Sequence, residues 1–328
     1  MAWDVFNTTS GAFTLNALTY AINQIPFQPM RLAQLGWFQE QGVATTSLTI
    51  EELNGVLSVL TVKPRGANGT VLTGEKRVVR SFVIPHIPAL AAVMADEVQN
   101  VRAFGQETAA QSVNDLQARY LARLRQSIEY VIESHRLTAV MGNYINAAGA
   151  STSLFTEFGV SQQTEAMALT TSTTKLRQKV LSILTKIESA LGGIPYSGVR
   201  ILCGATFWSE FIEHEVVKAT YQYQNADQLR SNPTGAMEWG GVIWERYRGT
   251  ASVLIPTDEA YAVPEGVPGL FLTRFGPADY SETVNTIGLP LYAKAEIMDF
   301  GKGINLEAQS NPLNLCTRPA AVIKLTKT

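Results

Sequence analysis

Two short patterns in the sequence have the spacing of catalytic or metal-binding residues. Ser172 and Lys175 stand three residues apart, like the serine nucleophile and the lysine of penicillin-recognising hydrolases. Neither companion motif of those enzymes occurs later in the chain, so the pair fits the start of a helix better. His214 and Glu215 begin a run that resembles a zinc-protease helix, but Lys218 stands where the second histidine ligand is needed. A serine-lysine type hydrolase therefore stays only as an alternative function.

The other residue types that build catalytic or metal sites are few and poorly spaced. The three histidines have no second ligand nearby in sequence: His86, His135 and His214. The sequence also contains no phosphate-binding glycine loop and no dinucleotide fingerprint. The adjacent acids Glu51 and Glu52 would face opposite sides of a strand, which fits surface charge better than catalysis. We therefore predict no catalytic residues, no metal ligands, no cofactor, and a protein that is not an enzyme.

The composition suggests a surface that meets other protein surfaces. Hydrophobic residues make up 46% of the 328 residues, and charged residues only 16%, against roughly 25% in ordinary soluble domains. Such a weakly charged chain is either an uncharged monomer or a subunit that buries surface against other copies. The net charge of −2 gives no general electrostatic reason to bind nucleic acid or an anionic membrane.

The cysteines and the apolar runs bear on where the protein is made. Cys203 and Cys316 are too few for a disulfide framework and fit a reducing cytosol, although one bridge between them stays open. The sequence has neither a secretory signal pattern nor an uncharged apolar run long enough to cross a membrane. We expect no membrane partner and no export by that route.

The elements predicted near the N-terminus are extended. Residues 1–45 form an apolar arm in which only Leu15, Leu18, Ile22 and Ile25 recur at helical spacing before Pro26. The arm needs a surface to lie on, either its own body or a neighbour. Two strand-like runs then flank Asn54-Gly55, the strongest signal for a two-residue hairpin turn.

A basic stretch follows within residues 63–84. It carries five basic residues against Glu75, a net charge of +4: Lys63, Arg65, Lys76, Arg77 and Arg80. It is either a solvated loop or an arm that reaches an acidic patch on another copy. The candidate residues at a subunit interface are Trp37, Phe38, Lys76, Arg77 and Arg80. Reversing Arg77 and Arg80 to glutamate should leave the subunit folded but block assembly.

Helices are predicted in the middle of the chain. A shorter helix is expected over 88–103, and a long one over 108–141 that begins with a capping box at Thr108 and Gln111. The long helix would extend about 50 Å. Three oppositely charged pairs lie opposite its apolar stripe and should face solvent or a neighbour: Asp115 with Arg119, Arg125 with Glu129, and Glu133 with Arg136.

The C-terminal half alternates one more helix with strands. A helix over 174–191 should end at Gly192, and a strand over 197–204 should precede a short helix capped by Thr206. Further strands are predicted at 241–247, 251–255, 269–275, 291–298, 303–307 and 320–325. The predicted class is α+β.

The last third of the chain contains more specific motifs. They include Gly240-Gly241-Val242-Ile243-Trp244-Glu245, Phe275-Gly276-Pro277-Ala278-Asp279-Tyr280, Leu289-Pro290-Leu291-Tyr292-Ala293-Lys294, Gln309-Ser310-Asn311-Pro312-Leu313 and Cys316-Thr317-Arg318-Pro319. These stretches resemble the major capsid protein E family of lambda-like tailed bacteriophages. The order of elements upstream also resembles that family, although the first 100 residues agree in pattern more than in motif.

The resemblance implies a Hong Kong ninety-seven type capsid fold. It divides the chain into an N-terminal arm (1–45), an extended β-hairpin loop (46–85), a peripheral domain (86–194) with a spine helix (108–141), an axial domain (195–290), and C-terminal strands that return to the peripheral domain (291–328). It also implies a major capsid protein that forms the hexamers and pentamers of an icosahedral head and expands from a procapsid. A minor virion component, such as a decoration or tail protein, is the other alternative.

The resemblance implies partners as well. They are other copies of the chain, a scaffolding protein, a portal, a possible decoration protein, and packaged DNA contacted non-specifically. Some relatives carry an N-terminal scaffolding segment, whereas this sequence starts almost at the arm, so we expect a separate scaffolding protein. Assembly is expected in the host bacterial cytoplasm.

Overall fold

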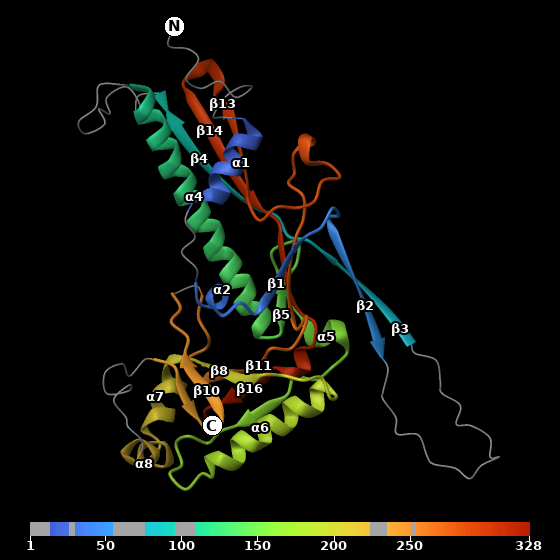
Figure 1. Ribbon diagram of the computed structural model, residues 1–328, viewed down its shortest axis with the longest axis vertical. Coiled ribbons are helices and arrows are strands. Elements are labelled where there is room, and N and C mark those ends of the chain that lie inside the picture. Colours follow the sequence, from blue (N-terminus) through green and yellow to red (C-terminus); the bar gives the residue numbers. More distant parts are fainter. Residues whose placement is uncertain are drawn as a thin grey trace, which may run out of the picture.

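The computed structural model describes residues 14–25, 30–54, 76–95, 97, 109–223, 235–250 and 253–328. The subunit is elongated, with a three-stranded sheet near one end, a six-stranded sheet near the other, and helix α4 (Ala109–Val140) between them (Figure 1). Helices and mainly antiparallel strands occur together, which agrees with the predicted α+β class.

One end of the subunit consists of the sheet β13–β14–β4, covered on one face by helices. The strands are β4 (Ile87–Met94), β13 (Tyr292–Ile297) and β14 (Gly303–Ser310). Helix α1 (Leu15–Gln24) buries Leu18 and Ile22 against this sheet and against α4. Both predicted helices are confirmed here, because α1 ends before Pro26 and α4 matches the expected 108–141; Thr108 lies outside the described residues.

The helix predicted over 88–103 is wrong in its first part. Ile87–Met94 is the strand β4, which pairs along its whole length with β14. Ala89, Ala91 and Val93 face the covered side, whereas Leu90 and Met94 are exposed. This alternation has the period of a strand, and pairing with β14 outweighs the helical preference of the alanines. Residues 98–103 lie outside the described part.

A long hairpin projects from the side of the body (Figure 1). It consists of β2 (Ser47–Asn54) and β3 (Lys76–Val83), paired from Ser47 with Val83 to Asn54 with Lys76. The predicted turn at Asn54-Gly55 is wrong, because Asn54 belongs to the ladder and its partner is Lys76. Residues 55–75 of the predicted basic loop lie outside the described residues.

The other end of the subunit is built on the sheet β7–β16–β11–β8–β10–β9. Its strands are β7 (Thr164–Ala166), β8 (Gly198–Cys203), β9 (Met237–Trp239), β10 (Val242–Arg246), β11 (Glu259–Glu265) and β16 (Ile323–Thr326). The sheet thus combines strands from the predicted segments 86–194, 195–290 and 291–328. β10 lies parallel to β8, and β7 lies parallel to β16.

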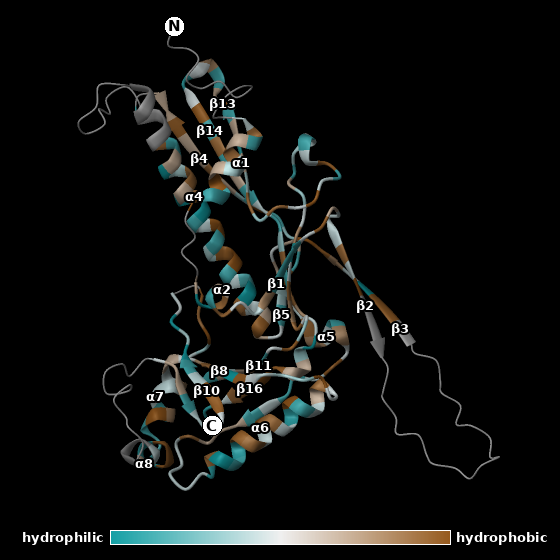
Figure 2. Ribbon diagram, viewed as in Figure 1, coloured by the Kyte–Doolittle hydropathy of each residue, from teal (hydrophilic) through white to brown (hydrophobic). Residues whose placement is uncertain are grey.

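Three helices accompany this sheet: α6 (Leu176–Leu191), α7 (Ala205–Glu213) and α8 (Glu215–Tyr223). Along α6, hydrophobic and hydrophilic residues alternate at helical spacing (Figure 2). α6 confirms the predicted helix and ends at Gly192 in the left-handed conformation. The prediction that Thr206 caps α7 is wrong, since Gly204 occupies the cap position and Thr206 lies within the helix.

Short elements join the two ends. They are α2 (Arg31–Leu35), β1 (Phe38–Gly42), β5 (Asn143–Ile145), β6 (Ser151–Ser153), α5 (Leu154–Phe158), β12 (Phe271–Phe275) and β15 (Pro312–Cys316). Short 3-10 helices also occur at Ser281–Thr283, Pro319–Ala321 and, in the turn between β13 and β14, Asp299–Gly301. β12 lies between β1 and β15. The strand predicted at 251–255 is wrong where it is described, because Val253 forms only an isolated bridge with Thr250.

Candidate assembly surfaces

Helix α2 in the N-terminal arm is capped by a carboxylate from α4. Glu133, 2% exposed, accepts hydrogen bonds from the Leu32 backbone N–H (2.8 Å) and from the Tyr247 hydroxyl (3.0 Å). Met30, at the cap position of α2, makes no side-chain capping bond, so Glu133 satisfies an amide that the helix leaves unpaired. Burial raises the pKa of the Glu133 carboxyl, while the bond from Leu32 opposes that rise. The arm is thus fixed to the spine helix.

A network of charged side chains ties the same arm to the six-stranded sheet. Arg31 forms a two-point ion pair with Glu245 on β10, with Nη2 at 2.7 Å from Oε2. Arg200 on β8 bridges Glu245 (2.9 Å) and Glu265 (2.7 Å). The indole N–H of Trp37 also donates to Glu265, at 3.1 Å. The charges of two arginines and two glutamates balance, so this contact between the arm and the sheet can be partly buried without an unpaired charge.

The two aromatic residues predicted at a subunit interface make their contacts within the chain. Trp37 stacks on Phe271 at 6.1 Å between ring centroids, and Phe38 packs against the same ring at 5.0 Å. Phe38 is only 7% exposed. The Arg136 guanidinium lies 5.3 Å from the Phe38 ring and pairs with Glu40. Phe38 therefore has almost no surface left to offer a neighbouring subunit.

The base of the projecting hairpin is anchored by Arg80. Its Nε donates to the carbonyl oxygen of Glu157 at 2.6 Å, and its guanidinium lies 5.0 Å from the centroid of the Phe158 ring. Phe82, on the same side of β3, meets the Tyr144 ring edge-on at 5.2 Å. Arg80 thus helps to set the direction of the hairpin from inside its own chain.

On the face of β3 opposite Arg80 and Phe82, apolar residues lack cover. Val79 and Val83 on β3 are 59% and 54% exposed. Lys76 and Arg77 occupy the last paired positions of β3, opposite Asn54 and Leu53. A two-stranded ribbon with exposed valines is marginally stable in water unless another surface covers it.

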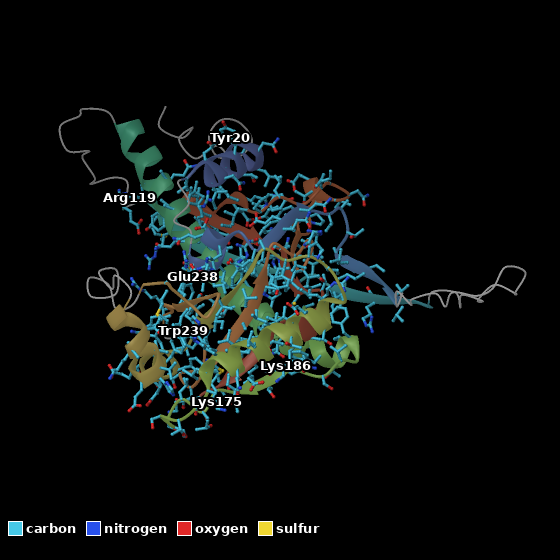
Figure 3. All side chains as sticks on the ribbon, turned by 60° about the horizontal axis from the view of Figure 1, so that its bottom comes forward. Tyr20, Arg119, Lys175, Lys186, Glu238 and Trp239 are labelled. Atoms are coloured by element: carbon cyan, nitrogen blue, oxygen red, sulfur yellow. The ribbon has the colours of Figure 1, made fainter. Side chains whose placement is uncertain are left out.

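The outer face of the sheet β13–β14–β4 is also open. Leu90 is 72% exposed and Met94 38%, whereas the opposite face of the sheet is buried under α1 and α4. Charged residues border this face: Glu296 is exposed, and the half-buried Lys294 forms an ion pair with Glu282 at 2.8 Å. Tyr20 on α1 (Figure 3), 69% exposed, adds a further apolar ring at this end of the subunit.

The candidate catalytic pair does not form a catalytic arrangement. Ser172 is exposed in the turn before α6, and Lys175 directly precedes that helix (Figure 3). Within the described residues, no hydrogen bond joins them. Thr174 uses its hydroxyl to bind the carbonyl of Ala168 at 2.9 Å, which orders the turn that opens α6.

Histidines and cysteines in the described part of the chain are buried or hydrogen-bonded within the fold. His214 donates to the Thr171 carbonyl (3.1 Å) and accepts from the Val216 N–H, which starts α8. Burial lowers the pKa of His135 to about 4. Cys203 and Cys316 are buried free thiols, so the disulfide that the sequence left open is not formed. No group of three or more potential metal ligands occurs among the described residues.

The described helices were also compared with the requirements for a membrane span. None of them combines the length and the low charge that crossing a bilayer requires.

The carboxylates that hold the arm could not be recognised from the sequence. Glu133 and Arg136 were expected on an exposed face of α4, but both are buried, 2% and 5% exposed. That prediction is wrong because the arm covers the second half of the helix. Arg125 and Glu129, nearer the start, do form the predicted pair, at 2.5 Å. The signal that could have shown the difference is the second apolar set at the end of α4, Leu137 and Val140, which packs in the same cluster as Leu32 of the arm.

Solved structures with the same arrangement of elements are phage capsid proteins. A putative capsid protein of an E. coli CFT073 prophage aligns with a TM-score of 0.62 at 13% identity, covering 97% of this chain and 100% of that one. The capsid of Myoviridae phage XM1 aligns with a TM-score of 0.54 at 13% identity, covering 92% of this chain and 93% of that one. The fold is therefore the Hong Kong ninety-seven type capsid fold.

Comparison of the sequence with known proteins defines the family. Residues 14–327 match the family described as phage major capsid protein E, and the chain belongs to that family. The major capsid protein of Pseudomonas phage KPP10 is 27% identical, with 89% of this chain and 90% of that protein covered. The major capsid protein of Salmonella phage Felix O1 (isolate Felix O1-VT1) is 22% identical, with 97% of each covered. The predicted function, a phage major capsid protein, is thereby confirmed, and the hydrolase alternative has no support.

Proposed function

We propose that copies of this chain assemble into the hexamers and pentamers of an icosahedral phage head that encloses the DNA genome. The family supports this proposal, and so does one observation in particular: the hairpin β2–β3 leaves the body with Val79 and Val83 exposed. In a closed shell every copy supplies its neighbour with a surface for such a segment. The head would begin as a procapsid and expand as DNA is packaged.

We assign the two domains of a capsid subunit to the two ends of this chain. The spine helix α4 with the sheet β13–β14–β4 would form the peripheral domain, and the six-stranded sheet with α6, α7 and α8 would form the axial domain at the capsomer centre. This proposal differs from the division predicted from the sequence, because it moves β7 and α6 out of the segment 86–194 and β16 out of the segment 291–328 into the axial domain. The arm, held by Glu133 and Glu245, would transmit movement between the two domains during expansion.

The proposed partners are those of a shell subunit. They are a scaffolding protein, a portal, a possible decoration protein, and DNA contacted without sequence preference, with assembly in the host bacterial cytoplasm. A net charge of −2 suits a protein that encloses DNA and does not read its sequence. The chain would work as a structural component without catalysis.

Charge reversal at Arg77 tests the proposed role of the hairpin. Arg77→Glu should leave the subunit folded but reduce shell formation at least tenfold, because the hairpin would carry the wrong charge toward its neighbour. Arg80 is unsuitable for this test, since it already contacts Glu157 and Phe158 within the chain. Arg177→Glu, on an exposed position of α6, is the matched control.

Sedimentation and electron microscopy of the chain co-expressed with its scaffold provide the measurement. If Arg77→Glu forms normal shells, the positive charge of the hairpin is not needed for assembly. A wild-type chain that stays a compact monomer at every concentration would overturn the proposed assembly itself.

A further inference from the structure

A cavity of about 240 Å³ lies where the N-terminal arm meets the spine helix. Residues of α1, α2, α4, β1 and β12, and of the segment that leads into β13, line it, so it is bounded by elements that join the two ends of the subunit (Figure 1). An engineered protein cavity of about 150 Å³ holds benzene. This space, which we call the joint cavity, is therefore large enough for a molecule with a few more atoms than benzene.

One buried hydrogen-bond donor in the lining of the joint cavity has no acceptor. Arg136 is 5% exposed, and its Nη2 pairs with Glu40, but its Nε has no hydrogen-bond partner among the described residues. Folded proteins rarely leave a buried N–H unpaired, because the group has given up its bond to water and gained nothing in return. The unpaired Nε therefore points to a guest in the cavity that accepts a hydrogen bond.

The same cavity also presents acceptors that no described residue uses. The side-chain amide nitrogen of Asn23 donates to the carbonyl oxygens of Thr19 (2.8 Å) and Leu291 (3.0 Å), which leaves its Oδ1 as an acceptor. Arg136 binds Oε1 of Glu40, and the second oxygen of that carboxylate receives no hydrogen bond from a described residue. The guest must therefore donate as well as accept, as a hydroxyl group does.

The charges of the lining favour a neutral guest. Arg136 pairs with Glu40, and Arg125 pairs with Glu129 at 2.5 Å, so most of the charge is already balanced. An anion would be repelled by the carboxylates of the lining, which include the buried Glu133. A small cation would leave the Nε of Arg136 without an acceptor. Neither kind of ion satisfies the lining as well as a neutral molecule.

The lining has an apolar part as well. Ile132, Phe275 and Leu291 are all buried and contribute side chains to it. A binding site of this kind combines an apolar surface with a few polar groups that fix the orientation of the ligand. The carbon chain of a small polyol can pack against the apolar side chains while its hydroxyl groups reach the polar ones.

We propose that the joint cavity binds a small neutral polyhydroxy molecule. One hydroxyl oxygen accepts a hydrogen bond from the Nε of Arg136, and other hydroxyl groups donate to Asn23 and Glu40. Because Asn23 and Glu40 belong to the arm and Arg136 belongs to the spine helix, the bound molecule links the arm to that helix.

Erythritol, a polyol with four carbons and four hydroxyl groups, is the probe, and saturation-transfer NMR on the unassembled full chain is the measurement. The wild type should bind erythritol with a dissociation constant in the millimolar range. Ala33→Leu should abolish this binding, because the larger side chain fills the cavity and leucine is a good helix former in α2. Ala219→Leu, at an exposed position of α8, is the matched control and should bind like the wild type.

A second variant tests the hydrogen bond itself. Arg136→Met keeps an unbranched apolar side chain but removes the Nε donor, and it should weaken erythritol binding at least about tenfold. Arg123→Met, at an exposed position of the same helix, should not change the affinity.

Three results would overturn the inference. Erythritol that does not bind the wild type would show that the cavity holds water only. Equal binding by Ala33→Leu would place the bound polyol elsewhere on the chain, and equal binding by a folded Arg136→Met would exclude the assigned hydrogen bond. None of these measurements depends on shell formation, so the proposed function is tested separately.

Discussion

The two sheets at opposite ends of the subunit are enclosed to different extents. Residues from both faces of the six-stranded sheet are buried: Ile201 and Trp244 belong to the cluster beneath α6 and α7, and Leu202 and Tyr261 to the cluster in the middle of the chain. The sheet β13–β14–β4 is covered on one face only, and Leu90 on the other face is 72% exposed. One end of the subunit is thus enclosed on both faces of its sheet, whereas the sheet at the other end has one open face among the described residues.

The largest effect on folding should come from the enclosed end. Trp244 is fully buried, its ring stacks on Phe211 at 4.0 Å, and its indole N–H donates to the Trp239 carbonyl at 3.0 Å. Trp244→Ala should lower the free energy of unfolding of the unassembled subunit by about 3–5 kcal/mol, measured by denaturant titration. A loss below about 1 kcal/mol would contradict the view that this end is enclosed by its own chain.

A smaller effect, dependent on pH, should appear at the edge of the same sheet. Glu165 on β7 is partly buried, which raises the pKa of its carboxyl, but hydrogen bonds from Lys179, Lys186 and Ser182 outweigh burial and lower that pKa to about 2. Because this folded-state pKa lies below the unfolded value, the ionised carboxylate stabilises the subunit above about pH 4.5, and this contribution is lost as the pH falls through about 2.

Replacing the carboxyl by an amide checks the size of that contribution. Glu165→Gln should lower the free energy of unfolding by about 1–2 kcal/mol at pH 7, after allowance for the partly exposed lysines. The difference from wild type should shrink on acidification. Glu238→Gln, at an exposed position of β9 (Figure 3), should show no such trend. If the free energies of unfolding of wild type and Glu165→Gln differ by the same amount at pH 7 and pH 2, the charge of Glu165 is not the source of the stabilisation.

The smallest effect on folding should come from the open sheet face. Leu90→Ser should change the free energy of unfolding by less than about 0.5 kcal/mol, because the side chain is already mostly in water. Shell yield should nevertheless fall if a neighbour covers this face. Leu181→Ser, a residue 62% exposed on α6, is the matched control. Equal shell yields from the two variants would show that the open sheet face matters no more for assembly than an exposed position on α6.

The long helices could be predicted from the sequence because their signal is local. In α6, Val180, Ile183 and Ile187 recur at helical spacing and are all buried. In β4, the run of small residues fits helix and strand equally well, and pairing with β14, more than 200 residues later, decides between them. Short strands such as β15 likewise depend on partners that no local pattern names.

The contacts of the arm lay beyond prediction for the same reason. Arg31 and Glu245 are 214 residues apart in sequence, and neither has a neighbour that marks it as half of an ion pair. The family motifs of the last third predicted the fold correctly, but they did not distinguish Phe38, which is buried, from Phe300, which is exposed. The residue type is the same at both positions, and only the fold decides which of the two rings is buried.

The small sheet β1–β12–β15 has a consequence for the timing of synthesis. β1 spans residues 38–42, yet its only partner strand in the described sheet is β12, at 271–275, which in turn pairs with residues 312–316. A growing chain on the ribosome therefore carries β1 unpaired through most of translation. Contacts between segments so distant in sequence form slowly compared with local helices. Helix α2 can contact Glu133 once α4 is made, but β1 can pair only after residues 271–275 have been synthesised, so the strand of the arm is the last part of it to find its place.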